Sequence, residues 1–350
     1  MDKKSLKDVK RNNTAKVLEY ILKQGPVSRI EIAEQSRFSP STVSMAVSLL
    51  LKDGIVEEVR EGVSTGGRKP ILLQMKEDYG CIITVSVLRN GVNAEVFDLS
   101  GKRIAERTLI SRYTSGNRLL KVIGGFVQEI QNGKTELPTR IIGLGLLCQD
   151  DLPEYDLMTE FSTSLSSDLI RLETALATRC GVPVKKELLN RYNLNYYLKT
   201  ADASCTDYAY VNIGERITAS FVLNRKMIHN SKDSIFDISS AVLSGSFAGY
   251  ENNPRGPMAI AQETALKSFS ADKLAEKLTQ VIKSALLFFP VKDVFIGGQV
   301  EGLEQVVEKI SQNFAFQPVI RKAGEPGKQI CDIFARQILW ENCYALIEVN

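Results

Sequence analysis

The chain has 350 residues, of which 44% are hydrophobic and 24% are charged, an ordinary composition for a soluble protein of two or three domains. No apolar run reaches the roughly 18 residues of a membrane helix, and residues 1–11 are lysine-rich without the apolar stretch of a secretory signal, so we expect a cytoplasmic protein with no membrane partner. The net charge is +3, and residues 1–75 carry 13 Lys plus Arg against 9 Asp plus Glu. This local positive excess points to a polyanion partner at that end of the chain.

The chain is poor in the residues on which many enzymes and metal sites depend. His229 is the single histidine, which leaves almost no material for Ser–His or Cys–His nucleophilic pairs or multi-histidine metal sites. The cysteines are scattered, with no pair at C-x-x-C spacing, at Cys81, Cys148, Cys180, Cys205, Cys331 and Cys343. This pattern argues against a disulfide framework or a thiolate metal site, and we expect reduced, mostly buried thiols.

Three helices are predicted near the start of the chain. In the first, apolar residues recur at helical spacing from Asn13 until a Gly-Pro pair ends the pattern. Ser28 then caps a short second helix, RIEIAEQS, and Glu31 completes a capping box. Two apolar residues of this second helix are predicted to face inward, Ile30 and Ala33.

The third helix has the features of a helix that reads DNA. Ser39 is its predicted N-cap, Pro40 takes the first helical position, and it runs to about Lys52. One side is an apolar stripe of Val43, Ala46, Val47, Leu50 and Leu51, and the other side carries Ser41, Thr42, Ser44, Met45 and Ser48. This small, hydroxylic side can enter a major groove about 12 Å wide and offer donors, acceptors and a methyl to bases and phosphates. Arg37 and Ser39 precede it and join the predicted DNA contacts; a small helical bundle with a serine-rich surface is the structural alternative.

A hairpin with a basic loop is predicted after the third helix. The strand IVEEVRE has ILLQM as its partner, and the loop GVSTGGRKP between them carries Arg68 and Lys69 at its tip. Such a loop suits a wing that reaches the DNA backbone or a narrow minor groove, which attracts arginine. A flexible basic linker explains the same residues equally well.

The motifs FSPSTVS, LLLKDGIVEE and STGGRKPILL closely resemble the DNA-binding module of the ROK family (repressors, open reading frames, kinases), in its branch of sugar-responsive repressors. Later segments also resemble the family. ITVSVLRNGVNAEVFDLSGK resembles its first hairpin, and IIGLGLLCQDD resembles a buried strand that enters a loop. VNIGERITASFVLN resembles the second, phosphate-binding hairpin, and VFIGGQVEG resembles the strand–turn–helix beside the nucleotide. The resemblance implies a winged helix-turn-helix domain over residues 1–76 and a two-lobed, actin-like (ribonuclease H-like) α/β domain over residues 77–350. Strands alternating with helices, around residues 169–179 and 271–289, fit that fold. The resemblance also implies that Arg68 contacts the minor groove.

The chain departs from the family's kinases at the nucleotide and at the catalytic base. Ser86 stands at the position of the kinase Asp, and the adjacent glycine and threonine positions hold Leu88, Arg89 and Asn90, which block the close approach of a phosphate. The general base falls on Leu189, or on Leu188 in the neighbouring register, and a leucine cannot accept a proton. Glu215 and Arg216 replace a usual Thr-Gly pair, and a strand-to-helix turn explains the retained Gly297 and Gly298. We therefore expect no catalytic residue and no cofactor.

The zinc and sugar motifs of the family are also changed. Asp237 and Ser240 occupy the positions of a Glu and of a zinc-binding His, and no cysteine lies between Cys205 and Cys331, so no metal site is expected. The loop SGSFAGYENNPRGP takes the place of the cysteine-rich segment. It is predicted either to be a solvated loop or to fold over a bound ligand.

Several polar residues remain at positions that line the family's sugar cleft. The resemblance makes these the candidate effector-binding residues: Glu187, Asn190, Arg191, Asp237 and Ser240. Arg191 and Arg216 suit an anionic ligand such as a sugar phosphate. A structural network in which both arginines pair with Glu187 and Glu215 explains them at least as well.

The sequence thus favours a DNA-binding transcriptional regulator, a repressor of carbohydrate-utilisation genes controlled by a sugar or sugar phosphate. We expect a homodimer or homotetramer on a pseudo-palindromic double-stranded operator. Two alternatives stay open. One is a ROK-type sugar kinase with a DNA-binding appendage, and the other is a DNA-binding dimer that senses no ligand.

Overall fold

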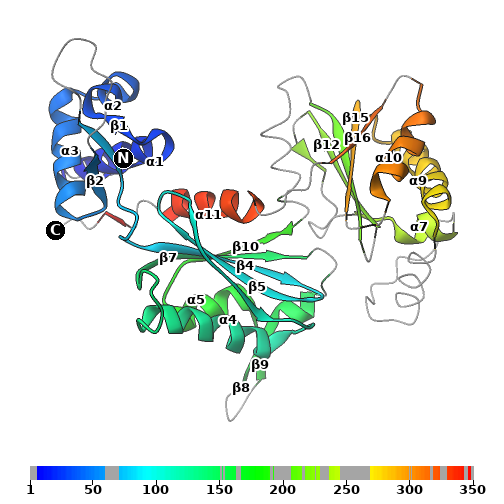
Figure 1. The fold of residues 1–350 in the computed structure, drawn as a ribbon, viewed down its shortest axis with the longest axis horizontal. Helices are drawn as coiled ribbons and strands as arrows, with labels where there is room; N and C mark the ends of the chain where they lie inside the picture. Colours follow the sequence, from blue (N-terminus) through cyan, green and yellow to red (C-terminus); the bar gives the residue numbers. More distant parts are fainter. Residues whose placement is uncertain are drawn as a thin grey trace. The chain divides into compact units, whose positions relative to one another are not determined.

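The computed structural model describes residues 6–59, 71–149, 152, 154–162, 167–189, 192, 206–214, 217–224, 226–228, 236–244, 269–298, 300, 302–315, 318–323, 329–342 and 346–347. The chain forms two compact units (Figure 1). The first contains Met1–Leu147, Glu154–Lys186 and Cys331–Asn350, and the second contains Cys148–Pro153 and Glu187–Ile330.

The N-terminal part of the first unit is a three-helix module with a small sheet. Its elements are α1 (Leu6–Gln24), β1 (Val27–Ser28), α2 (Arg29–Ser36), α3 (Pro40–Lys52), β2 (Val56–Val59) and β3 (Leu72–Met75). The sheet has the order β1-β3-β2, and β3 pairs antiparallel with both neighbours. Side chains from all three helices and the sheet are fully buried together, among them Leu18, Ile32, Val47, Leu50 and Leu73. The predicted third helix and hairpin are confirmed, with α3 beginning and ending where the capping residues indicate.

Two details of this module differ from the prediction. The first helix begins at Leu6 rather than near Asn13, because the polar residues before Asn13 contain neither a proline nor a glycine to stop it. Ile30 does not face inward: it is 67% exposed, whereas Ile32 is completely buried. Residues two positions apart in a helix point about 200° away from each other around the helix axis. A short helix that buries Ile32 must therefore expose Ile30.

A five-stranded sheet forms the centre of the rest of the first unit. Its order is β10-β7-β4-β5-β6. The strands are β4 (Cys81–Leu88), β5 (Gly91–Asp98), β6 (Arg103–Ile110), β7 (Ile141–Cys148) and β10 (Val184–Leu188). Helices α4 (Gly116–Gln131) and α5 (Leu172–Cys180) cover one face, and α11 (Gln329–Asn342) lies on the other (Figure 1). A short helix η1 (Glu154–Leu157) and the hairpin of β8 (Met158–Ser162) and β9 (Ser167–Arg171) complete this part. The helix predicted near residue 169 begins three residues later, because β9 continues to Arg171.

Glycines in β7 allow α11 to pack directly on the sheet. A Cβ at Gly143 would lie 2.5 Å from Ile338 Cγ2, and one at Gly145 would lie 2.5 Å from Phe334 Cε1. Real Cβ atoms essentially never come this close to another heavy atom. The two glycines therefore set the distance between α11 and the sheet.

The second unit is an α/β lobe around another sheet. The strand order is β13-β12-β11-β15-β16, and β14 pairs with β12. The strands are β11 (Tyr208–Ile213), β12 (Ile217–Leu223), β13 (Lys226–Met227), β14 (Phe236–Asp237), β15 (Asp293–Gly298) and β16 (Val319–Lys322). The helices are α7 (Ser239–Ser244), α9 (Ala271–Leu286) and α10 (Leu303–Gln312). Apolar residues of α9 and α10 pack with Val211, Ile217 and Ile296 in one buried cluster, so the predicted second hairpin and the strand–turn–helix after residue 293 are confirmed.

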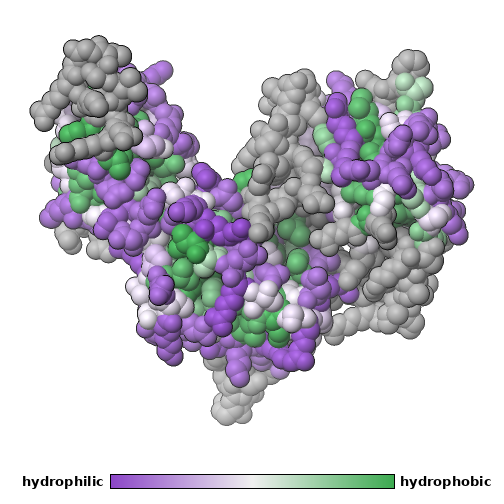
Figure 2. Space-filling model, viewed as in Figure 1, coloured by the Kyte–Doolittle hydropathy of each residue, from purple (hydrophilic) through white to green (hydrophobic). Residues whose placement is uncertain are grey.

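The surface of the described residues is mainly hydrophilic on the face shown, with hydrophobic residues in small separate patches (Figure 2). No helix among these residues has the length and apolar character that crossing a membrane requires. Within the same residues, no group of three or more His, Cys, Asp or Glu side chains is placed to hold a metal ion.

Candidate nucleic-acid interface

Three hydroxyls are gathered at the start of α3. The backbone of Ser39 is extended (φ −64°, ψ 147°), and its Oγ accepts the backbone N–H of Thr42 at 3.2 Å. The same Oγ lies 2.9 Å from Ser41 Oγ and 2.8 Å from Thr42 Oγ1. This N-cap arrangement follows from the Ser-Pro start of the helix, and it holds donors and acceptors together at one end of the predicted DNA-reading face.

The outer face of α3 is open to solvent and carries no carboxylate. Ser41, Ser44, Met45 and Ser48 are exposed and Thr42 is half-buried, whereas Val43, Ala46, Val47 and Leu50 are buried. Ser48 Oγ donates a hydrogen bond to the carbonyl of Ser44 at 2.8 Å. The hydrogen of Ser48 is therefore used inside the helix, while the other exposed hydroxyls and Met45 remain at the surface.

The turn between α2 and α3 presents positive charge near those hydroxyls. Arg37 caps the C-terminus of α2 in a left-handed conformation (φ 61°, ψ 19°) and is exposed. The ammonium of Lys16 lies 5.9 Å from the ring centroid of Phe38 in the same turn. Cations beside the N-terminus of α3 suit contact with phosphates. Arg68 and Lys69, the predicted wing contacts, lie outside the described residues.

The candidate effector residues are spread over several elements. Glu187 lies half-buried on β10, Asp237 on β14 and Ser240 in α7. One carboxylate oxygen of Asp237 accepts the backbone N–H of Ser239 at 2.9 Å, so this carboxylate supports the local turn into α7. The remaining candidates, Asn190 and Arg191, lie outside the described residues, as do Glu215, Arg216 and most of the loop after residue 244.

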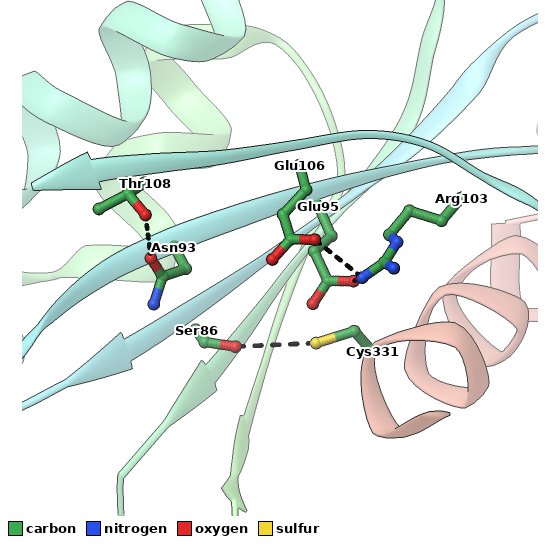
Figure 3. Close-up of polar contacts among 7 residues, drawn as sticks. All are labelled: Ser86, Asn93, Glu95, Arg103, Glu106, Thr108 and Cys331. Atoms are coloured by element: carbon green, nitrogen blue, oxygen red, sulfur yellow. Dashed lines mark hydrogen bonds and ion pairs between the residues drawn. The ribbon is translucent and has the colours of Figure 1, made fainter. Parts of the chain in front are cut away.

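A polar cluster lies around Ser86, the residue that the sequence resemblance aligns with an Asp of the kinases. Ser86 Oγ of β4 lies 3.7 Å from Cys331 Sγ of α11, and Arg103 Nη1 lies 2.9 Å from Glu95 Oε2 and 3.1 Å from Glu106 Oε2 (Figure 3). Burial raises the pKa of the Cys331 thiol to about 12, so this thiol stays protonated and unreactive at neutral pH. This contact could not be predicted from local sequence patterns, because Ser86 and Cys331 are 245 residues apart.

The retained glycines of β15 have a structural explanation. Gly298 has φ +133°, and a Cβ there would overlap the carbonyl group of Ile213. A Cβ at Gly297 would lie 2.7 Å from Tyr210 Oη. Both glycines are therefore required by neighbouring protein atoms. Leu188 and Leu189, the two positions available for a catalytic base, are half-buried leucines.

The chain matches proteins of known type in sequence and in fold. Residues 11–57 match the family model described as winged helix-turn-helix DNA-binding. The xylose repressor of Bacillus subtilis is 25% identical over 222 residues, which are 63% of this chain and 57% of that protein. The DNA-binding transcriptional dual regulator NagC of Escherichia coli is 35% identical over 133 residues, 37% of this chain and 33% of that protein. The chain is therefore similar in sequence, over these matched parts, to a repressor and a transcriptional regulator. The matches span little more than half of the first of these relatives and a third of the other.

A solved structure extends the likeness over both units. The crystal structure of a ROK-family transcriptional regulator, a homologue of the E. coli MLC protein, has a TM-score of 0.58 at 14% identity and covers 97% of this chain and 98% of that one. The predicted fold class, a winged helix-turn-helix followed by a two-lobed actin-like α/β domain, is thereby confirmed.

Proposed function

We propose that the chain is a DNA-binding transcriptional repressor whose larger domain, residues 77–350, binds a sugar or sugar phosphate. The exposed face of α3 carries this proposal, because it combines a cluster of hydroxyls, nearby cations and the absence of carboxylates. Its predicted DNA contacts are Arg37, Ser39, Ser41, Thr42, Ser44, Met45 and Ser48, joined by Arg68 and Lys69 of the wing. A sugar is the proposed effector because one relative is named as a xylose repressor, and a sugar phosphate is included because Arg191 and Arg216 would suit an anionic ligand.

Two copies of the chain would address two half-sites of a pseudo-palindromic operator in the cytoplasm, as a homodimer or a dimer of dimers. Recognition helices of such a pair meet half-sites one or more helical turns apart. An effector can make the protein release its operator only if it binds the conformation that cannot bind DNA more tightly than the conformation that can.

We propose further that the chain does not phosphorylate sugars. Leucine at both candidate base positions cannot accept the proton of a sugar hydroxyl, and protein packing alone accounts for Gly297 and Gly298. A kinase with a DNA-binding appendage is the competing function. Phosphate transfer from ATP to any sugar of a broad panel, measured with the purified protein, would establish the kinase.

DNA binding is tested by selecting duplexes from a randomised library with the full-length protein and measuring their affinity by fluorescence anisotropy. We expect enrichment of a pseudo-palindrome, and we expect Arg68→Ala to weaken its binding. Recovery of no sequence motif would contradict sequence-specific regulation. Thermal unfolding in the presence of sugars, amino sugars and their phosphates tests the effector, since a ligand of the folded state raises the midpoint. Absence of any shift would favour a DNA-binding dimer that senses no ligand.

A further inference from the structure

Met45 stands out on the exposed face of α3. It is 53% exposed, whereas Val43, Ala46, Val47 and Leu50 of the same helix are buried. A single exposed apolar residue is common on protein surfaces and means nothing by itself. Its position is what matters, because it lies in the middle of the face proposed to enter the major groove.

Most neighbours of Met45 on that face are small, and the larger Leu49 is half-buried. Residues three and four positions apart are adjacent on a helix surface, so Ser41 and Ser48 flank Met45 along the helix and Ser44 lies beside it in sequence. A methionine side chain extends three atoms beyond Cβ, against one in serine. Met45 therefore projects furthest from this face and would reach the edges of the bases first.

The hydroxyls around Met45 are largely engaged within the protein. Ser39, Ser41 and Thr42 contact one another at the N-cap, and Ser48 donates to the carbonyl of Ser44. The hydroxyl cluster is thus concentrated at the start of α3, while the middle of the face presents an apolar group. In the major groove the matching apolar feature of a base is the C5-methyl group of thymine.

Building on the proposed DNA binding, we propose that Met45 determines sequence specificity by packing its thioether against a thymine methyl, and so selects an A·T pair within each half-site. A methionine suits this contact because its side chain is unbranched, flexible and polarisable. Its sulfur is only a weak hydrogen-bond acceptor, so the contact does not depend on a hydrogen bond to the base. Specificity at this position thus comes from burial of one methyl group.

Replacement of thymine by uracil tests the contact, because it removes only the C5-methyl. The full-length protein is titrated with the duplex recovered from the randomised library and with derivatives in which each thymine in turn is replaced by deoxyuridine. We expect one position per half-site at which the loss of the methyl weakens binding about fourfold, the value of one buried methyl-sized group. Met45→Ala and Met45→Gln should bind the thymine and uracil duplexes equally, and Met45→Leu should retain the preference.

Ile30→Ala is the matched control. Ile30 is 67% exposed and lies in α2 rather than on the α3 face, so its removal should leave the thymine-to-uracil ratio unchanged. If the protein enriches a motif but no uracil replacement weakens binding, or if Met45→Ala keeps the ratio, the inference is overturned while the proposed function stands. If no motif is enriched at all, the proposed function itself fails. Unchanged thermal unfolding of the variants excludes a loss of folding.

Discussion

Ser28 and Glu31 bind each other at the start of α2. The backbone N–H of Ser28 donates to Glu31 Oε2 at 2.7 Å, and the backbone N–H of Glu31 donates to Ser28 Oγ at 3.2 Å. Together they satisfy two amide groups that the helix leaves without intrahelical partners. Ser28→Ala removes one of these bonds, and we expect it to lower the free energy of unfolding by about 1 kcal/mol. Chemical denaturation at neutral pH measures the difference, and equal midpoints would contradict it.

The same pair predicts a dependence of stability on pH. The pKa of Glu31 lies below its ordinary value of 4.5, because the carboxylate accepts hydrogen bonds from the backbone and side chain of Ser28. A carboxylate whose pKa is lowered by folding contributes stability above its ordinary pKa and loses it as the pH falls through the lowered value. We expect wild-type protein to be more stable than Glu31→Gln above pH 4.5, with the difference shrinking in more acidic solution. A difference that stays constant through that range would show that the charge of Glu31 plays no part.

Contacts between residues a few positions apart could be predicted from the sequence. Contacts between residues that only the tertiary structure brings together could not. The Ser-x-x-Glu capping box and the Ser-Pro start of α3 depend on neighbours within a few positions. The orientation of Ile30 was predicted wrongly, because an eight-residue helix offers too few turns to define its buried side. The contact of Ser86 with Cys331 depends on how the last helix packs on the sheet, which no local pattern encodes.

At the scale of elements, the packing of α11 on β7 depends on two glycines. We expect Gly145→Ala to lower the free energy of unfolding by about 1–3 kcal/mol, the usual cost of overpacking a core, because its Cβ would meet Phe334 and Ile338. Gly125 in α4 is the matched control, since nothing lies within 4 Å of a Cβ there. Gly125→Ala should be neutral or stabilise the protein by up to about 1 kcal/mol, as alanine favours helix more than glycine does.

Calorimetric or chemical denaturation measures the free energy of unfolding of Gly145→Ala and Gly125→Ala relative to the wild-type protein. Gly145→Ala as stable as Gly125→Ala would mean that α11 does not approach β7 closely. The family resemblance of IIGLGLLCQDD implied a buried strand, and all eight residues of β7 are buried. It did not predict that α11 would cover β7, since an apolar run does not specify its partner.

At the scale of the whole molecule, α11 connects parts of the chain that are distant in sequence. The boundary between the two compact units falls between Ile330 and Cys331, inside this helix. Near its other end, the ammonium of Lys23 in α1 lies 3.8 Å from the centroid of the Trp340 ring, a cation–π contact. The C-terminal end of α11 therefore contacts α1 of the winged helix-turn-helix module.

Trp340 is the single tryptophan of the chain, so its fluorescence reports this contact without interference. Lys23→Ala removes the ammonium that lies over the half-buried ring, and we expect the emission to shift to the red and iodide to quench it more strongly, because the indole gains access to water. Lys16→Ala is the matched control, since Lys16 lies over Phe38 within the DNA-binding module, and it should leave the emission unchanged. An emission spectrum of Lys23→Ala that coincides with that of the wild-type protein would mean that α1 and α11 do not meet in solution. Any coupling between the proposed effector and the winged helix-turn-helix module would then have to pass through another part of the chain.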